Sequence, residues 1–415
     1  MSVPKLRFQK FNGKWVKANL SQIVGSLESG VSVNSEDREM SLASEKGILK
    51  TSCISGGCFY PEEHKVILDE DVCRAKLNPK SGSILVSRMN TPMLVGEVGF
   101  VSYDCPRLFV PDRLWLVDVA DNSTDSTRWL CFQLTTPSLR YELGSVATGT
   151  SGSMKNISQP SFLGIEIFKP SLAEQTKIAA FLTAVDEKIT QLTQKHKLLT
   201  QYKKGVLQKI FNQDLRFKDE DGRDFPEWVP IELHELAFKS KTKNKDGSIK
   251  SVLTNSATLG VINQSDYFDR DIANQNNLEG YYVVEKDDFV YNPRISSTAP
   301  VGPINRNNQA KGVMSPLYTV FRFKSGFLDF FELYFQTNCW HDHMKSVANS
   351  GARHDRMNIT NEDFFSLPLL LPCEKEQTKI ANFLSAIDDK ISNAQSQLEA
   401  MGELLDDKII HPAIR

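Results

Sequence analysis

The 415-residue sequence lacks long hydrophobic runs. No stretch of 18 or more apolar residues appears, so no membrane-spanning helix is expected. The first five residues, MSVPK, lack the apolar segment of a secretory signal. We therefore expect a cytoplasmic protein with no membrane partner.

Cysteines are few and irregularly placed. There are seven, an odd number, and no CxxC pair occurs, which argues against a disulfide framework and against a zinc ribbon. Only the segment from Cys339 to His343 groups several metal-ligand residue types. Neighbours on one strand or helix cannot all face one ion, so an ordinary helix end is favoured there over a metal site.

Catalytic signatures are missing as well. The sequence has no G-x-x-x-x-G-K-[ST] phosphate loop and no glycine-rich S-adenosylmethionine signature. The segment 291–294 (YNPR) lacks the second proline and the aromatic residue of an adenine methyltransferase tetrad. We expect no catalytic residues, no cofactor and no metal. The net charge of −2 means that any nucleic-acid contact must come from local patches.

What the sequence does contain is an internal repeat. Residues 174–190 read EQTKIAAFLTAVDEKIT and residues 376–392 read EQTKIANFLSAIDDKIS, so 12 of 17 positions are identical. Proline precedes each copy at the same distance, at Pro170 and Pro372. A repeat of half the chain length indicates a duplicated architecture.

Weaker matches extend the repeat towards the amino terminus. Each half opens with Leu-Arg-Phe (6–8 and 215–217), followed by Trp15 or Trp228. Further pairs are Arg88 with Arg294, Gly96 with Gly302, 145–147 with 346–348 and 156–158 with 358–360. The helical segments repeat almost letter for letter, whereas the preceding domains share only a skeleton. This contrast indicates two different recognition domains on one common frame.

Both repeated segments predict long helices. Apolar residues alternate in steps of four and three, which is typical of a coiled-coil seam. The two prolines fit helix starts, and Glu174 and Glu376 suit the positive end of the helix dipole. The seam residues that we expect to pair the helices are Ile178, Leu182, Val185, Ile189, Ile380, Leu384, Ile387 and Ile391.

A helix of 35–40 residues extends about 55 Å. Two such helices in one chain can pack antiparallel and hold two domains apart, related by a pseudo-twofold axis. The alternative is that each helix packs only on its own domain. The sustained seam favours the intramolecular pair.

The segments before the helices are typical of mixed α/β (α+β) domains. β-Branched and aromatic residues between turn residues predict strands at 82–88 and 288–294. Residues 127–146 and 327–347 predict one helix each, and the aromatic residues Phe331, Tyr334 and Phe335 are expected in the core rather than as a base-stacking platform.

Two glycine-containing loops occupy matching places in the halves, at 148–155 and 349–356. Small residues allow a backbone to approach DNA closely, and arginine can contact guanine or phosphate. An ordinary glycine-rich turn remains the alternative. The candidate DNA contacts in these loops are Thr150, Ser151, Gly152, Lys155, Ser350, Gly351, Arg353 and Arg356, with Arg88 and Arg294 as weaker candidates at matching strand ends.

A cluster of lysines follows in the second half. Lys241, Lys243, Lys245 and Lys250 lie within ten residues that contain one acid, Asp246. A solvated loop is the ordinary explanation. In a chain near neutrality, the cluster is favoured as a site that neutralises DNA phosphates.

Two diverged domains, each followed by a run of the form Pro-x₃-EQTKIAxFLxAxDxKI, resemble the specificity subunit of type I restriction–modification systems. The runs here are 170–189 and 372–391, and the resemblance covers essentially the whole chain. It implies target recognition domains at 1–170 and 214–372, each reading half of a bipartite site in double-stranded DNA. The repeat helices at 171–213 and 373–415 would set the spacer between half-sites.

The same resemblance implies partners. The helices would dock two modification subunits that carry adenine methyltransferase activity, and a restriction subunit with translocase and nuclease activity would complete the enzyme. Two alternatives stay open: a coiled-coil scaffold that binds no DNA, and a stand-alone methyltransferase or nuclease. The missing motifs disfavour the stand-alone enzyme.

Overall fold

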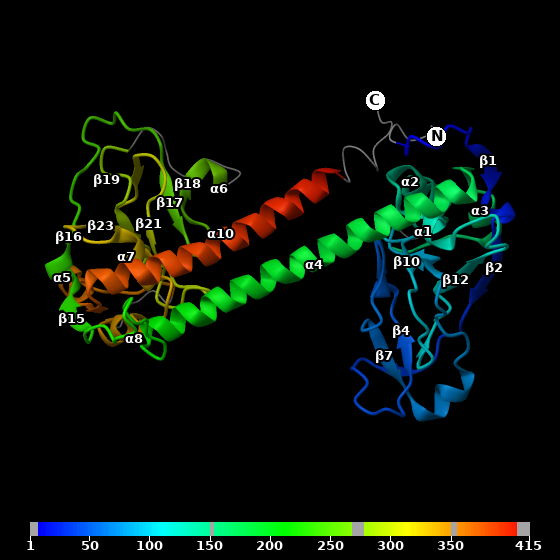
Figure 1. Cartoon of the computed structure of the whole chain (residues 1–415), viewed down its shortest axis with the longest axis horizontal. Coiled ribbons are helices and arrows are strands. Elements are labelled where there is room, and N and C mark those ends of the chain that lie inside the picture. The colour runs from blue at the N-terminus through cyan, green and yellow to red at the C-terminus, as the bar shows by residue number, and fades with distance from the viewer. Residues whose placement is uncertain (1–6, 150–152, 268–277, 350–354, 405–415) are drawn as a thin grey trace. The chain divides into compact units, whose positions relative to one another are not determined.

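The computed structural model describes residues 7–149, 153–267, 278–349 and 355–404 (Figure 1). The chain divides into two compact units. Unit 1 comprises Met1–Thr193 with Ser396–Arg415, and unit 2 comprises Gln194–Gln395. The division falls within both long helices, so each helix contributes to both units.

The central sheet of unit 1 has six strands in the order β2-β12-β8-β10-β6-β5. Its middle strands are apolar on both faces, because helices pack on one side and a second sheet on the other. The strands are β2 (Val24–Ser29), β5 (Ile54–Ser55), β6 (Gly57–Phe59), β8 (Ile84–Ser87), β10 (Val98–Phe100) and β12 (Leu114–Val119).

A four-stranded sheet in the order β11-β4-β7-β3 completes the body of unit 1, and two strand pairs, β1·β14 and β9·β13, flank it. The pairing of β1 with β14 joins the start of the domain to the strand that leads into the first long helix. These strands are β1 (Val16–Asn19), β3 (Ser35–Glu36), β4 (Gly47–Leu49), β7 (His64–Ile67), β9 (Met89–Asn90), β11 (Leu108–Phe109), β13 (Lys155–Asn156) and β14 (Glu166–Lys169).

Unit 2 repeats this frame with a four-stranded sheet, β16-β23-β20-β21, and the pair β15·β24 in place of β1·β14. Its strands are β15 (Val229–Glu232), β16 (Ala237–Lys239), β17 (Leu253–Ser256), β18 (Gly260–Asn263), β19 (Tyr282–Val284), β20 (Phe289–Tyr291), β21 (Ile304–Arg306), β22 (Gly312–Met314), β23 (Thr319–Phe323) and β24 (Pro368–Leu371). Short helices α5 (Leu233–Leu236), α6 (Gln264–Tyr267) and α9 (Asn361–Phe365) connect them; α3 (Gln159–Leu163) occupies the place of α9 in unit 1.

The prediction of one helix over 127–146 is wrong, because the segment forms α1 (Thr127–Thr135) and α2 (Pro137–Ser145). Pro137 has no N–H to continue α1 and forces Thr136 into an extended conformation. The prediction over 327–347 is wrong for a similar reason: the segment forms α7 (Leu328–Phe335) and α8 (His341–Ser346). The Thr337 hydroxyl donates to the Tyr334 carbonyl and accepts from the Cys339 N–H, which ends the helix.

The long helices are α4 (Leu172–Phe211) and α10 (Glu374–Leu404), each beginning two residues after the repeated proline. In unit 2 the last turns of α4 and the first turns of α10 share one core, so the helices run antiparallel there. An ion pair between Lys203 and Asp388, 2.7 Å long, joins them further along. The predicted class is confirmed: two similar α/β domains and two long helices.

The start of each helix also packs on its own domain. Ile178 and Ala179 belong to the core of unit 1. In unit 2, Ile380 and Leu384 lie in the same core as the aromatic residues of α7. The two arrangements that the seam left open therefore coexist, because the helix pair is itself part of a domain core.

Candidate nucleic-acid interface

The repeated helix starts are held by the repeated Leu-Arg-Phe segments. In unit 1, Arg7 forms two hydrogen bonds to the buried Glu174 carboxylate, 2.8 and 2.7 Å long. In unit 2, Arg216 contacts the fully buried Glu376 at 3.0 and 3.4 Å. The pKa of each arginine is raised, chiefly by these hydrogen bonds. We call each of these pairs a latch.

Phenylalanines and glutamines complete the latches. Phe8 packs edge-to-face on Phe181 at 5.9 Å between ring centroids, and Phe217 packs likewise on Phe383 at 5.3 Å. Gln175 and Gln377 each donate to the carbonyl of the proline five residues earlier. The repeated letters therefore fix how each domain meets its helix, a role that the sequence analysis missed although the Leu-Arg-Phe repeat was its signal.

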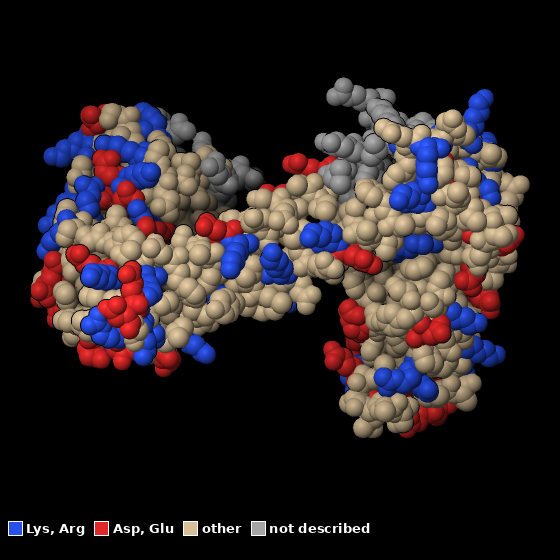
Figure 2. Space-filling view, viewed as in Figure 1, with Lys and Arg blue, Asp and Glu red and all other residues tan. Residues whose placement is uncertain are grey.

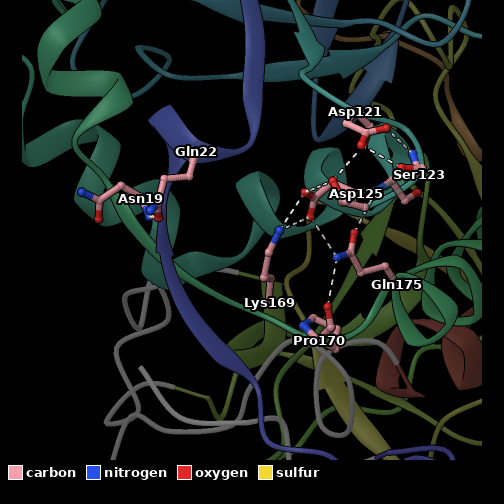
Figure 3. Close-up of polar contacts among 10 residues, drawn as sticks. Asn19, Gln22, Asp121, Ser123, Asp125, Lys169, Pro170 and Gln175 are labelled. Carbon is pink, nitrogen blue, oxygen red and sulfur yellow. Dashed lines mark hydrogen bonds and ion pairs between the residues drawn. The ribbon is translucent and has the colours of Figure 1, made fainter.

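Unit 1 has an additional polar junction at this place (Figure 3). The buried Asp125 carboxylate accepts bonds from the Lys169 ammonium at 2.7 and 2.8 Å and from Gln175 at 3.1 Å. The Gln175 side-chain oxygen accepts from the Ser126 N–H, so one glutamine joins the starts of α1 and α4. Every member is satisfied, which makes the junction a rigid support rather than a reactive site.

The candidate residues of unit 1 converge on the pair β9·β13. Lys155 lies opposite Asn90, and the Arg88 guanidinium donates to Asn156 at 3.4 Å. Arg88 also lies over the Trp115 ring, 5.5 Å from its centroid. The strand end and the loop end that the sequence singled out separately are therefore neighbours.

Unit 2 builds the matching arrangement from Arg294 and Arg356, which form an antiparallel bridge. Backbone bonds from Ile295 to Asp355 and from Met357 to Pro293 hold the two segments together. Arg294 is exposed, and the buried Nε of Arg356 lies 3.5 Å from the Asp355 carboxylate without forming a hydrogen bond among the described residues. Like charges on opposed residues repel, so this bridge is suited to a negatively charged ligand.

Six loop candidates lie outside the described residues: Thr150, Ser151, Gly152, Ser350, Gly351 and Arg353. Their immediate neighbours on the described side are the paired segments above. Their role stays a prediction.

The lysine cluster is an ordered, exposed ridge. Lys243 lies opposite Tyr282 of β19, and the Val283 N–H donates to the Thr242 carbonyl. The buried Asn244 side chain accepts from the Ile249 N–H and donates to the Ile249 carbonyl. Figure 2 has lysine and arginine side chains gathered around β16 and β19. We define the lysine ridge as Lys239, Lys241, Lys243, Lys245 and Lys250, of which all but Lys239 are exposed.

The start of the ridge contacts the segment that follows the Arg294–Arg356 bridge in the chain. Lys239, at its start, donates to Asn361 at 2.8 Å, five residues after Arg356. Burial and the neighbouring Lys241 charge lower the pKa of Lys239. Among the described residues, none of Lys241, Lys243, Lys245 and Lys250 forms an ion pair.

The seam residues of both helices face inwards. Val185, Ile380, Leu384 and Ile387 are buried, and the other four are half-buried. The segment from Cys339 to His343 forms the start of α8, with Trp340 in the core. Over the described ranges, no group of three or more His, Cys, Asp or Glu side chains could hold a metal ion. None of the described helices is both long and apolar enough to cross a bilayer.

Comparison with known proteins gives the family. The type I restriction modification DNA specificity domain matches residues 41–201 and again residues 226–400. A Methanocaldococcus jannaschii protein, named as a type I restriction enzyme MjaX specificity subunit, is 25% identical over 349 residues, 80% of this chain and 77% of that protein. The S subunit of a type I restriction-modification system from M. genitalium shares the fold, with a TM-score of 0.59 at 15% identity over all of both chains. With two copies of the domain, the chain belongs to the type I restriction–modification DNA specificity family and is a DNA sequence-specificity subunit.

Proposed function

We propose that each unit reads one half of a bipartite duplex DNA site through its paired segments. The target recognition domains would span 1–170 and 214–372, with repeat helices at 171–213 and 373–415. The observation that carries the proposal is the Arg294–Arg356 bridge: Arg356 pairs with the exposed Asp355 at 3.5 Å, whereas Arg294 forms no ion pair with the described residues. A DNA phosphate or a guanine edge supplies the acceptors that the exposed Arg294 guanidinium lacks.

Replacing one arginine of the bridge tests this assignment. Arg356→Ala should relax recognition of one half-site, since a bidentate base contact is worth about 1–3 kcal/mol of discrimination. The same is expected of Arg353→Ala in the adjoining loop. Arg223→Ala, at an exposed arginine of unit 2 that pairs with Asp219 and Asp221, is the matched control. Unchanged methylation motifs and DNA affinity in the Arg356 and Arg353 variants would overturn the assignment.

The lysine ridge would neutralise phosphates without reading bases. Its exposed ammonium groups would release counterions on binding, a sequence-independent contribution to affinity. In unit 1, Lys155 and Arg88 beside β9·β13 would take the corresponding place.

We propose that the helix pair sets the spacing of the half-sites. Four residues inserted near Gln194 lengthen α4 by about 6 Å, equivalent to roughly one or two base pairs. Methylome sequencing should then give a motif with the same half-sites and a longer gap. Changed half-sites with an unchanged gap would refute the ruler.

The activities of the complete enzyme would belong to its partners: two modification subunits docked on the helices, and a restriction subunit. The purified chain should then neither methylate nor cleave DNA, and methylation should begin only when modification subunits are added. Methyl transfer by the isolated chain, after removal of contaminants, would contradict this division of labour. A chain that showed no salt-dependent binding to duplex DNA would instead favour the scaffold that binds no DNA.

A further inference from the structure

Unit 1 carries a small exposed apolar tip beside its paired segments. We define the tip as Thr91–Leu94, the turn that follows β9. The Met93 side chain is 84% exposed and that of Leu94 is 46% exposed. Exposed apolar side chains cost little singly, but two in succession next to a proposed binding segment need an explanation.

The tip is held rigidly. The N–H groups of Leu94 and Val95 donate to the Thr91 carbonyl at 3.0 and 2.9 Å. Arg140 of α2 donates to the carbonyls of Met93 and Val95, each at 3.3 Å, and pairs with Glu97 at 2.9 Å. The backbone of the tip is therefore fixed before any ligand binds, which lowers the entropy cost of using these side chains in a complex.

Its surroundings indicate a polyanion. The tip begins one residue after Asn90, which lies opposite Lys155. Arg88 is two residues further back, half-buried against Trp115. Positive charge thus borders one side of an apolar tip, whereas two side chains present far less surface than the roughly 800 Å² per partner of a stable protein interface.

We propose that Met93 and Leu94 contact thymine methyl groups in the major groove of the half-site read by unit 1. The thymine methyl is the one apolar group on the base edges of that groove, and apolar side chains read it by contact. This inference rests on the proposed function and adds specificity-determining residues to it.

Unit 2 lacks an exposed pair of long apolar side chains at the corresponding positions. Val95 and Gly96 correspond to Val301 and Gly302 in the repeat, which places Ala299 and Pro300 where unit 1 has Met93 and Leu94. Ala299 is 7% exposed, and Pro300, although exposed, presents no long apolar side chain like that of Met93 or Leu94. The thymine-methyl contact is therefore expected for one half-site only.

Removing the methyl group from the DNA tests the contact directly. The wild-type enzyme, assembled with its modification subunits, is titrated with duplexes carrying its own site, with thymine or deoxyuridine in one half-site at a time. Wild-type affinity should fall roughly fourfold per methyl in the unit 1 half-site, which corresponds to the loss of one buried methyl-sized group. It should not change for the unit 2 half-site.

The double variant Met93→Ala/Leu94→Ala should bind the thymine duplex more weakly and no longer distinguish thymine from deoxyuridine. Leu42→Ala, at an apolar side chain of unit 1 that is 61% exposed in another loop, should behave as wild type. A wild-type enzyme that binds its own site no better than scrambled DNA defeats the proposed function itself.

Three outcomes would overturn the thymine-methyl contact of the tip while leaving sequence-specific DNA binding intact. The first is a double variant with wild-type affinity and wild-type thymine preference. The second is a variant that binds weakly while the wild type ignores deoxyuridine, which indicates insertion between base steps. The third is a variant that reads DNA normally but fails to assemble with modification subunits, which indicates a protein contact.

Discussion

Edge segments of the two units differ in how their charges are paired. In unit 1, β3 lies at the edge beside β7, and its charged neighbours are paired: Arg38 with Glu36 and Glu45, and Asp37 with Lys50 and Lys65. Arg38 and two backbone N–H groups lower the pKa of Glu45 to about 2. In unit 2, the segment beside β19 is the lysine ridge, whose four exposed lysines form no described ion pair.

The second sheets differ in strand order as well. In unit 1, β4 lies between β11 and β7. In unit 2, β22 lies between β19 and Val252, the residue that precedes β17. The duplication has therefore kept four strands of the central sheet and the latches but not the outer sheet. We infer that the frame fixes where a ligand surface lies and leaves the pairing of its charges free to change.

The latches are expected to show the largest effect, and a similar one in both units. Arg216→Ala or Arg7→Ala leaves a buried carboxylate without its cation, which typically costs about 3–5 kcal/mol of unfolding free energy. Urea denaturation of the two variants measures this loss. Arginine-to-lysine variants, which keep the charge but lose the paired hydrogen bonds, should lie between the alanine variants and wild type. A loss below about 1 kcal/mol in one unit only would mean that the latches are not equivalent.

Replacing the repeated tryptophans, Trp15 and Trp228, should destabilise the two units by different amounts. Trp228 donates its indole N–H to Glu376 at 3.0 Å, whereas the buried Trp15 N–H finds no partner among the described residues. Trp228→Phe should therefore destabilise by about 1.5–3 kcal/mol more than Trp15→Phe, the value of a hydrogen bond to a charged group. Thermal or urea unfolding of the pair gives the difference. Equal losses of unfolding free energy in the two variants would show that the hydrogen bond from the Trp228 indole to Glu376 adds no stability.

Removing lysines from the ridge tests the charge contrast. Lys241→Ala/Lys243→Ala should weaken binding to every duplex and reduce the slope of log affinity against log salt by about 2, one unit for each lost phosphate contact. Lys50→Ala/Lys65→Ala in unit 1 removes the same charge from cations that already have carboxylate partners. If the slope of log affinity against log salt falls equally in both variants, the unpaired lysines of unit 2 contribute no more to DNA binding than the paired lysines of unit 1.

The smallest effect is expected at the ion pair between the helices in unit 2. Lys203 is 17% exposed and Asp388 46%, so solvent screening limits the pair to about 0.2–1 kcal/mol. A double-mutant cycle should give a coupling energy in that range, and exchanging the charges with Lys203→Asp/Asp388→Lys should restore most of it. In unit 1, Asp186 occupies the place that Asp388 has in the repeat, and it pairs with Arg128 of its own unit at 3.2 Å. Coupling that is absent, or that the exchange does not restore, would remove Lys203 from the determinants of helix register.

Much of the frame that holds the candidate site could be predicted from particular residues. The seam steps and the repeated EQ motif identified α4 and α10, and the offset of the repeat related Arg88 to Arg294. Breaks within the shorter helices were harder to foresee. Pro137 marks the break between α1 and α2 in the sequence. The break near Thr337 depends on a hydrogen bond from its hydroxyl to the Tyr334 carbonyl, which residue type alone does not predict.

The duplication, the long helices and the family can be predicted from the sequence alone, because helix periodicity and near-identical repeats are local patterns that need no knowledge of neighbours. Folding brings together Arg7 and Glu174, separated by 167 residues, to form a latch, and it places Arg294 opposite Arg356. The fold also holds Met93 on a rigid turn, because the Arg140 side chain of α2 donates a hydrogen bond to the Met93 carbonyl. Such contacts join residues far apart in the chain, and the pairing of distant segments depends on how the whole core packs.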